Sequence, residues 1–476
     1  MFLSSNLLRL PPAALLLAVA LLQPAPAQAT GCPSPNPGAL HKLVQDAFLR
    51  FKLKKSLLWV EGASGPLYFE GLGGATKDSL FLPASTSKWV TAATLLRLVD
   101  EKRIALDDKV SKYLPSFTGA KAAITIRQCL SHASGLPEHH WSLNYRNITL
   151  AQAVSQIAKV KLVYAPGTTF YYGSVSFQVA ARVAEVVTNQ DFESVVRSRI
   201  TGPLGMTATD FQGWGATKNP LAALSLRTTP RDMMKFLRML RDRGTIGSRR
   251  ILSKASVDAM FTNQIKGLKY VKNPYSDAPY GIGSWLDGLD PSGKGYLVSH
   301  FGAFGFCPWI DFSRGIIGIY ATQDSYYRAA PVARNIRTTL RETHLPLGLR
   351  CLGSSTPSCR GPIRPFADGI PKSGTNGFSV GCLDAPPNSF GVLAFGVLLL
   401  NPGQPLLGAR LFIAGPPFLV LSPLRSSSTG SFSTSLDFRN VVGPSKFLLQ
   451  FLWLNPKGCG TFGSLSASPA LEVRVQ

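Results

Sequence analysis

Residues 80–90 read LFLPASTSKWV, in which a strand-like apolar run ends at Ala84 and a helix is predicted to begin at Ser85. The helix is predicted to extend to Asp100. Its apolar face is formed by Val90, Ala93, Leu96 and Leu98. Ser85 and Lys88 are three residues apart, which places them one turn apart on the same helical face. The first turn of this helix therefore presents a serine and a lysine together.

A serine and a lysine in this arrangement can act as nucleophile and base. A lysine amine within hydrogen-bond reach can take the proton of a serine hydroxyl if burial and cationic neighbours lower its pKa. The free N–H groups at a helix N-terminus can also stabilise a developing oxyanion. The SxxK spacing alone is weak evidence, because a capping serine beside a solvated lysine gives the same pattern.

A second stretch, PGTTFYYGS at residues 166–174, precedes an apolar-faced helix. A tyrosine near lysine-like cations can ionise and serve as a base or a proton shuttle. Tyr172 is the candidate for this role, and the alternative is an ordinary half-buried aromatic residue.

A third stretch, His300-Phe301-Gly302-Ala303, ends a predicted strand. Gly302 would let a substrate lie against the strand edge, and the N–H of Ala303 could complete an oxyanion hole. The alternative for His300 is a partly exposed histidine at the end of a strand.

These three motifs, in this order and at this spacing, resemble those of class C β-lactamases, serine DD-peptidases and β-lactamase-like esterases. Three further stretches resemble the same group: LVDEKRIALDDKVSKYLP, ITIRQCLSHASGLP and YGIGSW. The resemblance covers about residues 41–345. It implies a sheet flanked by helices beside an all-helical lobe, with the active site between them.

The resemblance also implies a role for each motif residue. Ser85 would be the acylated nucleophile, Lys88 its general base, and Tyr172 the group that protonates the leaving group and later activates water. The N–H groups of Ser85 and Ala303 would form the oxyanion hole. The implied substrate-binding residues are Ser174, His300 and Gly302. No cofactor and no metal is expected.

Two residues depart from the β-lactamase pattern. Ser174 replaces an asparagine, and His300 replaces a lysine. An unperturbed histidine is mostly neutral above pH ~6.5, so it holds a substrate carboxylate less reliably than lysine would. These departures argue against a dedicated β-lactamase, and the HxG form does not separate a DD-peptidase from an esterase. The leading hypothesis is an esterase or amidase acting on small substrates. A DD-carboxypeptidase or D-amino-acid peptidase, a β-lactamase, and a non-catalytic surface-binding scaffold remain alternatives.

Residues 377–381, GFSVG, match the GxSxG nucleophile elbow of another hydrolase fold. That fold requires a helix after the serine and a histidine later in the chain. The sequence after Ser379 is turn-like, and the last histidine is His344. We therefore interpret this match as accidental.

The chain is predicted to have three parts. Residues 1–29 have the features of a signal peptide, which indicates a secreted, periplasmic or cell-envelope protein without a transmembrane span after cleavage. Residues 30–346 are predicted to form an α/β (α+β) hydrolase domain, whose sheet is mixed or antiparallel and is built from both ends of the segment. Within this domain the sequence predicts a hairpin with its turn at residues 62–66, helix caps at Thr149 and Thr229, and a closing helix at residues 331–342. Residues 347–476, rich in Gly, Pro, Ser and short apolar runs, are predicted to form an all-β, sandwich-like module.

The net charge is +24, from 50 Lys and Arg against 26 Asp and Glu. This favours contact with an anionic cell-envelope surface, and a solvated basic surface without a partner is the alternative. The basic residues are scattered and form no nucleic-acid-binding motif, so nucleic acid is not expected as a partner.

Export implies an oxidising compartment, in which disulfides form. Two disulfides are expected among Cys351, Cys359, Cys382 and Cys459, with the pairing open. Cys129, with apolar neighbours, is expected to be a small buried residue. Cys32 and Cys307 could be free or paired.

Overall fold

The computed structural model describes residues 36–476 except 272–275, 348, 353–354, 357, 370, 374–377, 397, 407–408, 415–418, 437, 439–444, 458, 460–463 and 476. The chain forms two compact units, which we call the N-terminal unit (residues 35–347 with 368–370) and the C-terminal unit (most of residues 348–476). The predicted signal peptide, residues 1–29, lies outside the described residues.

The N-terminal unit is built on a six-stranded sheet in the order β2-β1-β10-β9-β8-β7. Every neighbouring pair is antiparallel. Its strands are β1 (Ser56–Gly62), β2 (Gly65–Leu72), β7 (Trp285–Leu289), β8 (Gly295–Ser299), β9 (Phe306–Asp311) and β10 (Ile316–Thr322). The first two strands and the last four come from opposite ends of the unit. The prediction of a sheet built from both ends is therefore confirmed, and the sheet is antiparallel.

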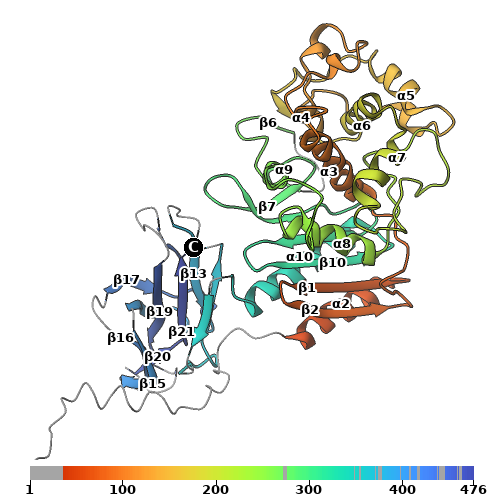
Figure 1. The fold of residues 1–476 in the computed structure, drawn as a ribbon. Helices are drawn as coiled ribbons and strands as arrows, with labels where there is room; N and C mark the ends of the chain where they lie inside the picture. Colours follow the sequence, from red (N-terminus) through yellow and green to blue (C-terminus); the bar gives the residue numbers. More distant parts are fainter. Residues whose placement is uncertain are drawn as a thin grey trace, which may run out of the picture. The chain divides into compact units, whose positions relative to one another are not determined.

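Helices cover both faces of this sheet (Figure 1). Helices α2 (Pro37–Arg50) and α10 (Tyr326–Thr343) pack on one face, where Val44, Tyr320 and Ile336 share a buried apolar cluster. Helix α8 (Pro230–Arg241) packs on the other face, and its Phe236 shares a second core with Leu57 and Ile319. Because both faces are covered, every residue of β1 is buried.

The remaining helices and short strands of the unit form a helical lobe and its connections. They are α3 (Ser87–Asp100), α4 (Ile126–Leu130), α5 (Leu150–Ile157), α6 (Val175–Thr188), α7 (Phe192–Val196), α9 (Lys254–Met260), β3 (Thr169–Phe170), β4 (Thr245–Ile246), β5 (Arg249–Arg250) and β6 (Lys269–Tyr270). Capping side chains fix where several of them begin. Thr149 accepts a hydrogen bond from the Gln152 N–H at the start of α5, and Thr229 accepts one from the Asp232 N–H at the start of α8.

One helix begins earlier than the sequence predicts. The expected closing helix starts at Pro331, the residue type that favours a first helical turn. The observed α10 begins at Tyr326, because the Ser325 side chain accepts a hydrogen bond from the Tyr327 N–H and caps the helix there. Pro331 therefore lies inside the helix, on its exposed side.

The C-terminal unit consists of strands, as predicted. Its larger sheet has the order β11-β21-β19-β14-β17 with β20 beside β19, and two smaller sheets are β12-β13-β18 and β15-β16. The strands are β11 (Leu349–Leu352), β12 (Arg364–Asp368), β13 (Phe378–Leu383), β14 (Phe390–Gly396), β15 (Leu398–Leu406), β16 (Ala409–Ala414), β17 (Leu419–Arg425), β18 (Phe432–Leu436), β19 (Ser445–Leu454), β20 (Leu465–Ala467) and β21 (Ala470–Val475). Phe432 of β18 contacts Phe451 and Trp453 of β19 at ring-centroid distances of 6.2 and 5.8 Å, so two of the sheets pack against each other. This arrangement agrees with a sandwich-like module.

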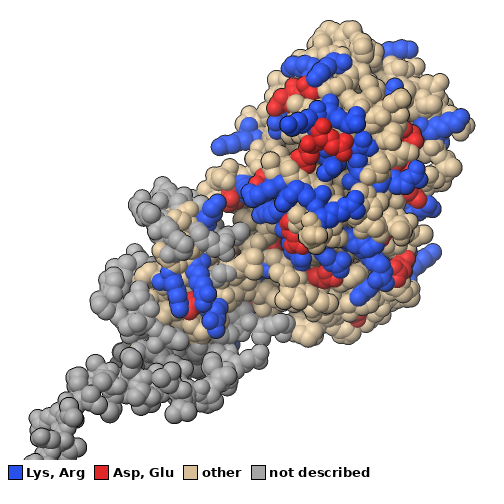
Figure 2. All heavy atoms as spheres, in the orientation of Figure 1, with Lys and Arg blue, Asp and Glu red and all other residues tan. Residues whose placement is uncertain are grey.

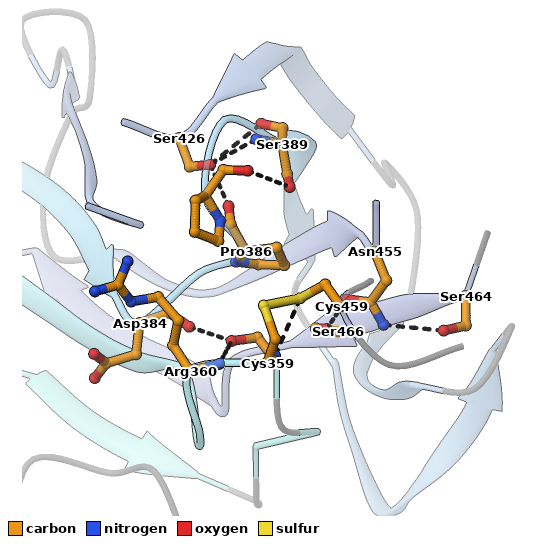
Figure 3. The surroundings of a disulfide bond; sticks show 12 residues. Cys359, Arg360, Asp384, Pro386, Ser389, Ser426, Asn455, Cys459, Ser464 and Ser466 are labelled. Carbon is orange, nitrogen blue, oxygen red and sulfur yellow. Dashed lines mark hydrogen bonds between the residues drawn. A yellow bond between two sulfur atoms is a disulfide. The ribbon is translucent and has the colours of Figure 1, made fainter. Parts of the chain in front are cut away.

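A disulfide joins Cys359, in a turn before β12, to Cys459, which follows β19 (Figure 3). Cys351 is also disulfide-bonded. Cys382 is a free, buried thiol in β13, so the expectation of two disulfides among these four cysteines is wrong. Cys129 and Cys307 are free and buried, which confirms the prediction for Cys129.

The positive charge is distributed over the surface. Figure 2 shows Lys and Arg side chains spread over the visible face, with Asp and Glu among them. Asp258, for example, pairs with Arg243, Lys254 and Lys294. Among the helices of the described residues, none is both long and apolar enough to cross a membrane.

Candidate active site

Ser85 and Lys88 lie together, as their spacing predicts. Ser85 is in a short 3₁₀ turn (Ala84–Thr86) that leads directly into α3, and Lys88 is in the first turn of that helix. The Lys88 Nζ donates to the Ser85 Oγ at 3.2 Å and to the backbone oxygen of Ala223 at 3.3 Å. Lys88 is only 1% exposed and Ser85 8%. The serine hydroxyl and its candidate base are thus in hydrogen-bond contact within a nearly closed site.

Burial changes the chemistry of Lys88. Loss of solvation disfavours its charged form and lowers the Lys88 pKa from its ordinary value of 10.5 to about 7, against the opposing effect of the Glu138 carboxylate. At neutral pH a large fraction of Lys88 is therefore the neutral amine, the form that can accept a proton from Ser85.

The backbone just before the nucleophile is held in an unusual conformation. Ala84 has φ +46°, a left-handed value that costs energy for a residue with a Cβ. Ser87 holds this turn in place: its hydroxyl donates to the Ala84 oxygen at 2.5 Å and accepts from the Leu226 N–H at 3.0 Å. The position of Ser85 is thus fixed by contacts on both sides of the turn.

Tyr172 faces the same lysine. Its ring centroid is 4.7 Å from the Lys88 Nζ, and it is 7% exposed. The ring packs between His132, at a centroid distance of 4.4 Å, and Trp285, stacked at 5.4 Å. The three residues that the sequence assigns to catalysis, Ser85, Lys88 and Tyr172, therefore lie at one site.

The segment 132–138 holds the backbone around Tyr172. The His132 oxygen accepts from the Tyr171 N–H at 2.9 Å, and the His132 Nδ1 accepts from the Gly173 N–H at 3.3 Å. The Glu138 oxygen accepts from the N–H of Ser174 at 2.8 Å. A Cβ on Gly173 would lie 2.5 Å from the Glu138 Cα, so this close contact requires glycine. Ser174 itself is half-buried and precedes α6.

His300 is buried completely, not partly exposed. Its Nε2 lies 3.0 Å from the Tyr280 hydroxyl, and its backbone oxygen accepts from the Thr86 hydroxyl at 2.7 Å. Its Nδ1 has no hydrogen-bond partner within the described part of the chain. Burial, and then the charge of Lys88, hold the His300 pKa well below its usual value, so the ring is neutral.

Gly302 and Ala303 lie against the segment that contains the nucleophile. A Cβ on Gly302 would meet the Pro83 oxygen at 1.9 Å, so only glycine fits there. Neither the Ser85 N–H nor the Ala303 N–H donates a hydrogen bond to any acceptor among the described residues. These are the two donors that the sequence predicts for the oxyanion hole.

Ser379, the serine of the GxSxG match, does not lie at a strand-to-helix turn. Ser379 lies within β13, where it pairs with Ser435 of β18. A nucleophile elbow needs a sharp strand-to-helix turn at the serine, and Ser379 is in the middle of an extended strand. This agrees with the interpretation of the match as accidental.

Sequence reasoning missed several residues of this site. Tyr280 and Trp285 pack around Tyr172, at centroid distances of 6.1 and 5.4 Å. Both lie in the stretch YGIGSW, which contributed to the resemblance but received no role. Ala223, whose oxygen binds Lys88, belongs to no motif, and only the folded chain brings it to the site.

Comparison with known proteins agrees with this geometry. Residues 58–341, more than half of the chain, match the family model described as Beta-lactamase. Penicillin-binding protein 4 of Amycolatopsis lactamdurans is 35% identical over 152 residues, which are 31% of this chain and 40% of that protein. Esterase EstB of Burkholderia gladioli is 31% identical over 151 residues, which are 27% of this chain and 38% of that protein. The chain thus spans less than half the length of these two relatives.

A solved structure of a β-lactamase-like protein from Bacteroides dorei DSM 17855 has the same fold. It is 29% identical, covers 64% of this chain and 98% of its own, and superimposes with a TM-score of 0.60. The fold, the family match and the hydrolases among the relatives all agree. The chain therefore belongs to the β-lactamase family of serine hydrolases.

Proposed function

We propose that the protein hydrolyses small esters or amides through an acyl-enzyme on Ser85. The main support is the contact between the buried Lys88 amine and the Ser85 hydroxyl, with a lysine pKa of about 7. Lys88 accepts the proton of Ser85 as its oxygen attacks the substrate carbonyl. The carbonyl oxygen becomes an oxyanion, which accepts hydrogen bonds from the N–H groups of Ser85 and Ala303.

Tyr172 then protonates the leaving oxygen or nitrogen as its bond to the acyl carbon breaks, and it regains a proton from Lys88. Acyl-Ser85 remains. In the second half, Tyr172 accepts a proton from a water molecule that attacks the acyl carbon, and a proton passes through Lys88 to the departing Ser85 oxygen. Every proton taken from Ser85 or from water is thus returned to a product or to the enzyme.

Two residues favour esters or amides over β-lactams. Ser174 is shorter than an asparagine and offers no side-chain amide to the substrate. His300 is neutral and buried, so it supplies no positive charge for the carboxylate of a β-lactam. We therefore expect p-nitrophenyl butyrate to be hydrolysed with a higher kcat/KM than nitrocefin.

A second candidate is a peptidase that acts on peptides ending in D-Ala-D-Ala. It is favoured by the 35% identity to Penicillin-binding protein 4. Release of D-alanine from such a peptide, faster than ester hydrolysis and abolished in Ser85→Ala, would favour this candidate over an esterase.

A fluorophosphonate probe tests the nucleophile directly. Peptide mapping should place the adduct on Ser85, and Ser85→Ala should neither be labelled nor turn over any ester. Ser379→Ala is the matched control and should keep both labelling and activity. An adduct on Ser379 would contradict the proposal.

We also propose that the protein is exported, with residues 1–29 as its signal peptide, and that its positive charge favours contact with anionic envelope polymers. N-terminal sequencing of the mature protein tests the first statement. Co-sedimentation with isolated envelopes at low and high salt tests the second, since an electrostatic contact weakens as salt increases.

A further inference from the structure

A pocket of about 430 Å³ opens beside Ala303. Its walls include three apolar side chains, from Leu82, Trp214 and Phe304, and residues 323–325 complete the lining. No residue to which we assign catalysis, apart from Ala303, lines it.

The pocket adjoins the reacting centre through two of its walls. Leu82 lies three residues before Ser85, and Ala303 is a proposed donor of the oxyanion hole. Gly302 holds these two walls together, because its Cα lies so close to the Pro83 backbone that a Cβ would meet the Pro83 oxygen at 1.9 Å. A carbonyl oxygen bound by the Ser85 and Ala303 N–H groups would therefore lie beside the pocket, since Ala303 is part of its lining.

The apolar walls are both exposed and fixed in place. Trp214 and Phe304 are each 39% exposed, so both present apolar surface to the pocket that they line. The turn around Trp214 is closed by a hydrogen bond from the Gly215 N–H to the Gln212 oxygen at 2.7 Å. The Asp324 N–H donates to the Phe304 oxygen at 3.1 Å and fixes the backbone of the second wall. A preformed apolar surface of this kind binds apolar groups at low entropic cost.

The one charged residue of the pocket already has partners. The Asp324 carboxylate pairs with Arg328 at 3.1 Å and accepts from the Ser325 N–H at 2.5 Å. Because these contacts balance its charge, the pocket has little reason to select a cationic group. We therefore attribute its selectivity to the apolar walls, Leu82, Trp214 and Phe304.

We propose that this pocket binds an apolar acyl group of the substrate, extended from the carbonyl carbon that Ser85 attacks. The inference rests on the proposed function and makes it more specific: the preferred substrates are esters or amides of apolar acids, with a medium-length alkyl chain or a phenyl ring. Trp214, Phe304 and Leu82 determine this specificity.

A chain-length series with the full-length protein tests the inference. The kcat/KM values are measured for p-nitrophenyl acetate, butyrate, hexanoate and phenylacetate. Hexanoate and phenylacetate should exceed acetate by tenfold or more. Trp214→Ala and Phe304→Ala should each reduce the hexanoate-to-acetate ratio severalfold, and the double variant should bring it close to one.

Two further variants keep the test interpretable. Trp214→Leu retains an apolar wall and should lower the ratio less than Trp214→Ala does, which provides a result if the alanine variants fold poorly. Trp141→Ala removes an aromatic side chain that is 51% exposed and does not line the pocket, so it should leave the ratio unchanged.

The possible failures are distinguishable. Suppose that Ser85 is labelled by the fluorophosphonate. A flat chain-length profile, or a wild-type ratio in both Trp214→Ala and Trp214→Leu, would then show that the pocket is not an acyl subsite, while the proposed function stands. If Ser85 forms no adduct, the proposed function fails and this inference fails with it.

Discussion

At the scale of single residues, the decisive feature is the buried amine of Lys88. A general base must be unprotonated, so activity should increase with pH as Lys88 loses its proton. Because its pKa is about 7, the acidic limb of kcat/KM against pH should have its midpoint near that value. A stopped assay with p-nitrophenyl butyrate from pH ~5 to ~9 measures this limb. If kcat/KM shows no transition near pH ~7 within this range, Lys88 does not act as a base of lowered pKa.

The same burial means that Lys88 should lower the free energy of unfolding. The folded-state pKa lies below the unfolded value, so the unfolded chain binds more protons between about pH 7 and 10.4. The contribution of Lys88 to the free energy of unfolding therefore increases with pH across this window and is most unfavourable below about pH 7.

Replacing Lys88 by methionine should consequently give an inactive protein with a smaller dependence of stability on pH. The free energy of unfolding of Lys88→Met minus that of the wild type should be larger at pH ~6 than at pH ~9, by roughly 2–3 kcal/mol. Each pKa unit corresponds to about 1.4 kcal/mol. Urea unfolding of both proteins at the two pH values measures the difference. An equal difference in the free energy of unfolding at both pH values would show that the pKa of Lys88 is not lowered in the folded protein.

The sequence predicts the reactive residues better than their surroundings. Ser85 and Lys88 are neighbours on one helix, so local spacing is enough to place them together. Tyr172 is 84 residues beyond Lys88, and only the resemblance to a family connects the two. Tyr280 and Ala223 could not be assigned, because their contacts depend on how the lobe packs against the sheet.

At the scale of elements, the segment 132–138 acts as a template for the segment that contains Tyr172. His132 contributes both its backbone oxygen and its Nδ1 to this contact, and its φ of +58° is tolerated by few residue types. We assign His132 as a positioning residue, which acts through the Gly173 N–H on Tyr172.

Two substitutions separate positioning from packing. His132→Phe keeps a ring but loses the acceptor, and it should lower kcat by about 10- to 100-fold with a smaller change in KM, since misplaced catalytic groups affect the transition state most. His132→Asn places an oxygen close to the position of Nδ1 and accepts a positive φ, so it should recover much of kcat. Steady-state kinetics measures both, with circular dichroism as the check on folding. Higher activity in His132→Phe than in His132→Asn would indicate that the packing of the ring, and not the acceptor, is what matters.

Elements with clear local signals were predicted well. The hairpin of β1 and β2, and the caps at Thr149 and Thr229, follow from turn and capping residues that act over a few positions. The prediction that α10 begins at Pro331 was wrong, because Pro331 is a stronger sequence signal than Ser325, the residue that caps the helix. Pro331 is accommodated near the helix start, on an exposed side where no partner has to pack against it.

At the scale of the whole molecule, the change in composition near residue 347 is enough to predict two parts of the chain. The pairing of the cysteines could not be predicted, because it depends on tertiary structure. Cys382 is a buried free thiol in β13, so it forms no disulfide. Cys359 and Cys459 are 100 residues apart and lie in turns next to different sheets. No local pattern could indicate that these two would meet.

This disulfide should stabilise the C-terminal unit specifically. A crosslink that closes a loop of about 100 residues restricts the unfolded chain and contributes roughly 2–5 kcal/mol. Cys129 and Cys307, the described cysteines of the N-terminal unit, are free thiols, so a reductant has no bond to break between them. The paired substitution Cys359→Ser/Cys459→Ser should therefore lower the melting temperature of the C-terminal unit.

We propose that the C-terminal unit contributes binding or stability rather than chemistry, because none of the three catalytic motifs lies within it. The Cys359→Ser/Cys459→Ser protein should accordingly keep its kcat/KM for p-nitrophenyl acetate, even at temperatures where its C-terminal unit has melted. Calorimetry resolves the two transitions, and the ester assay follows the N-terminal unit through the same temperature range. If activity is lost together with the earlier transition, the C-terminal unit is needed for the integrity of the active site, and our assignment of chemistry to the N-terminal unit alone is wrong.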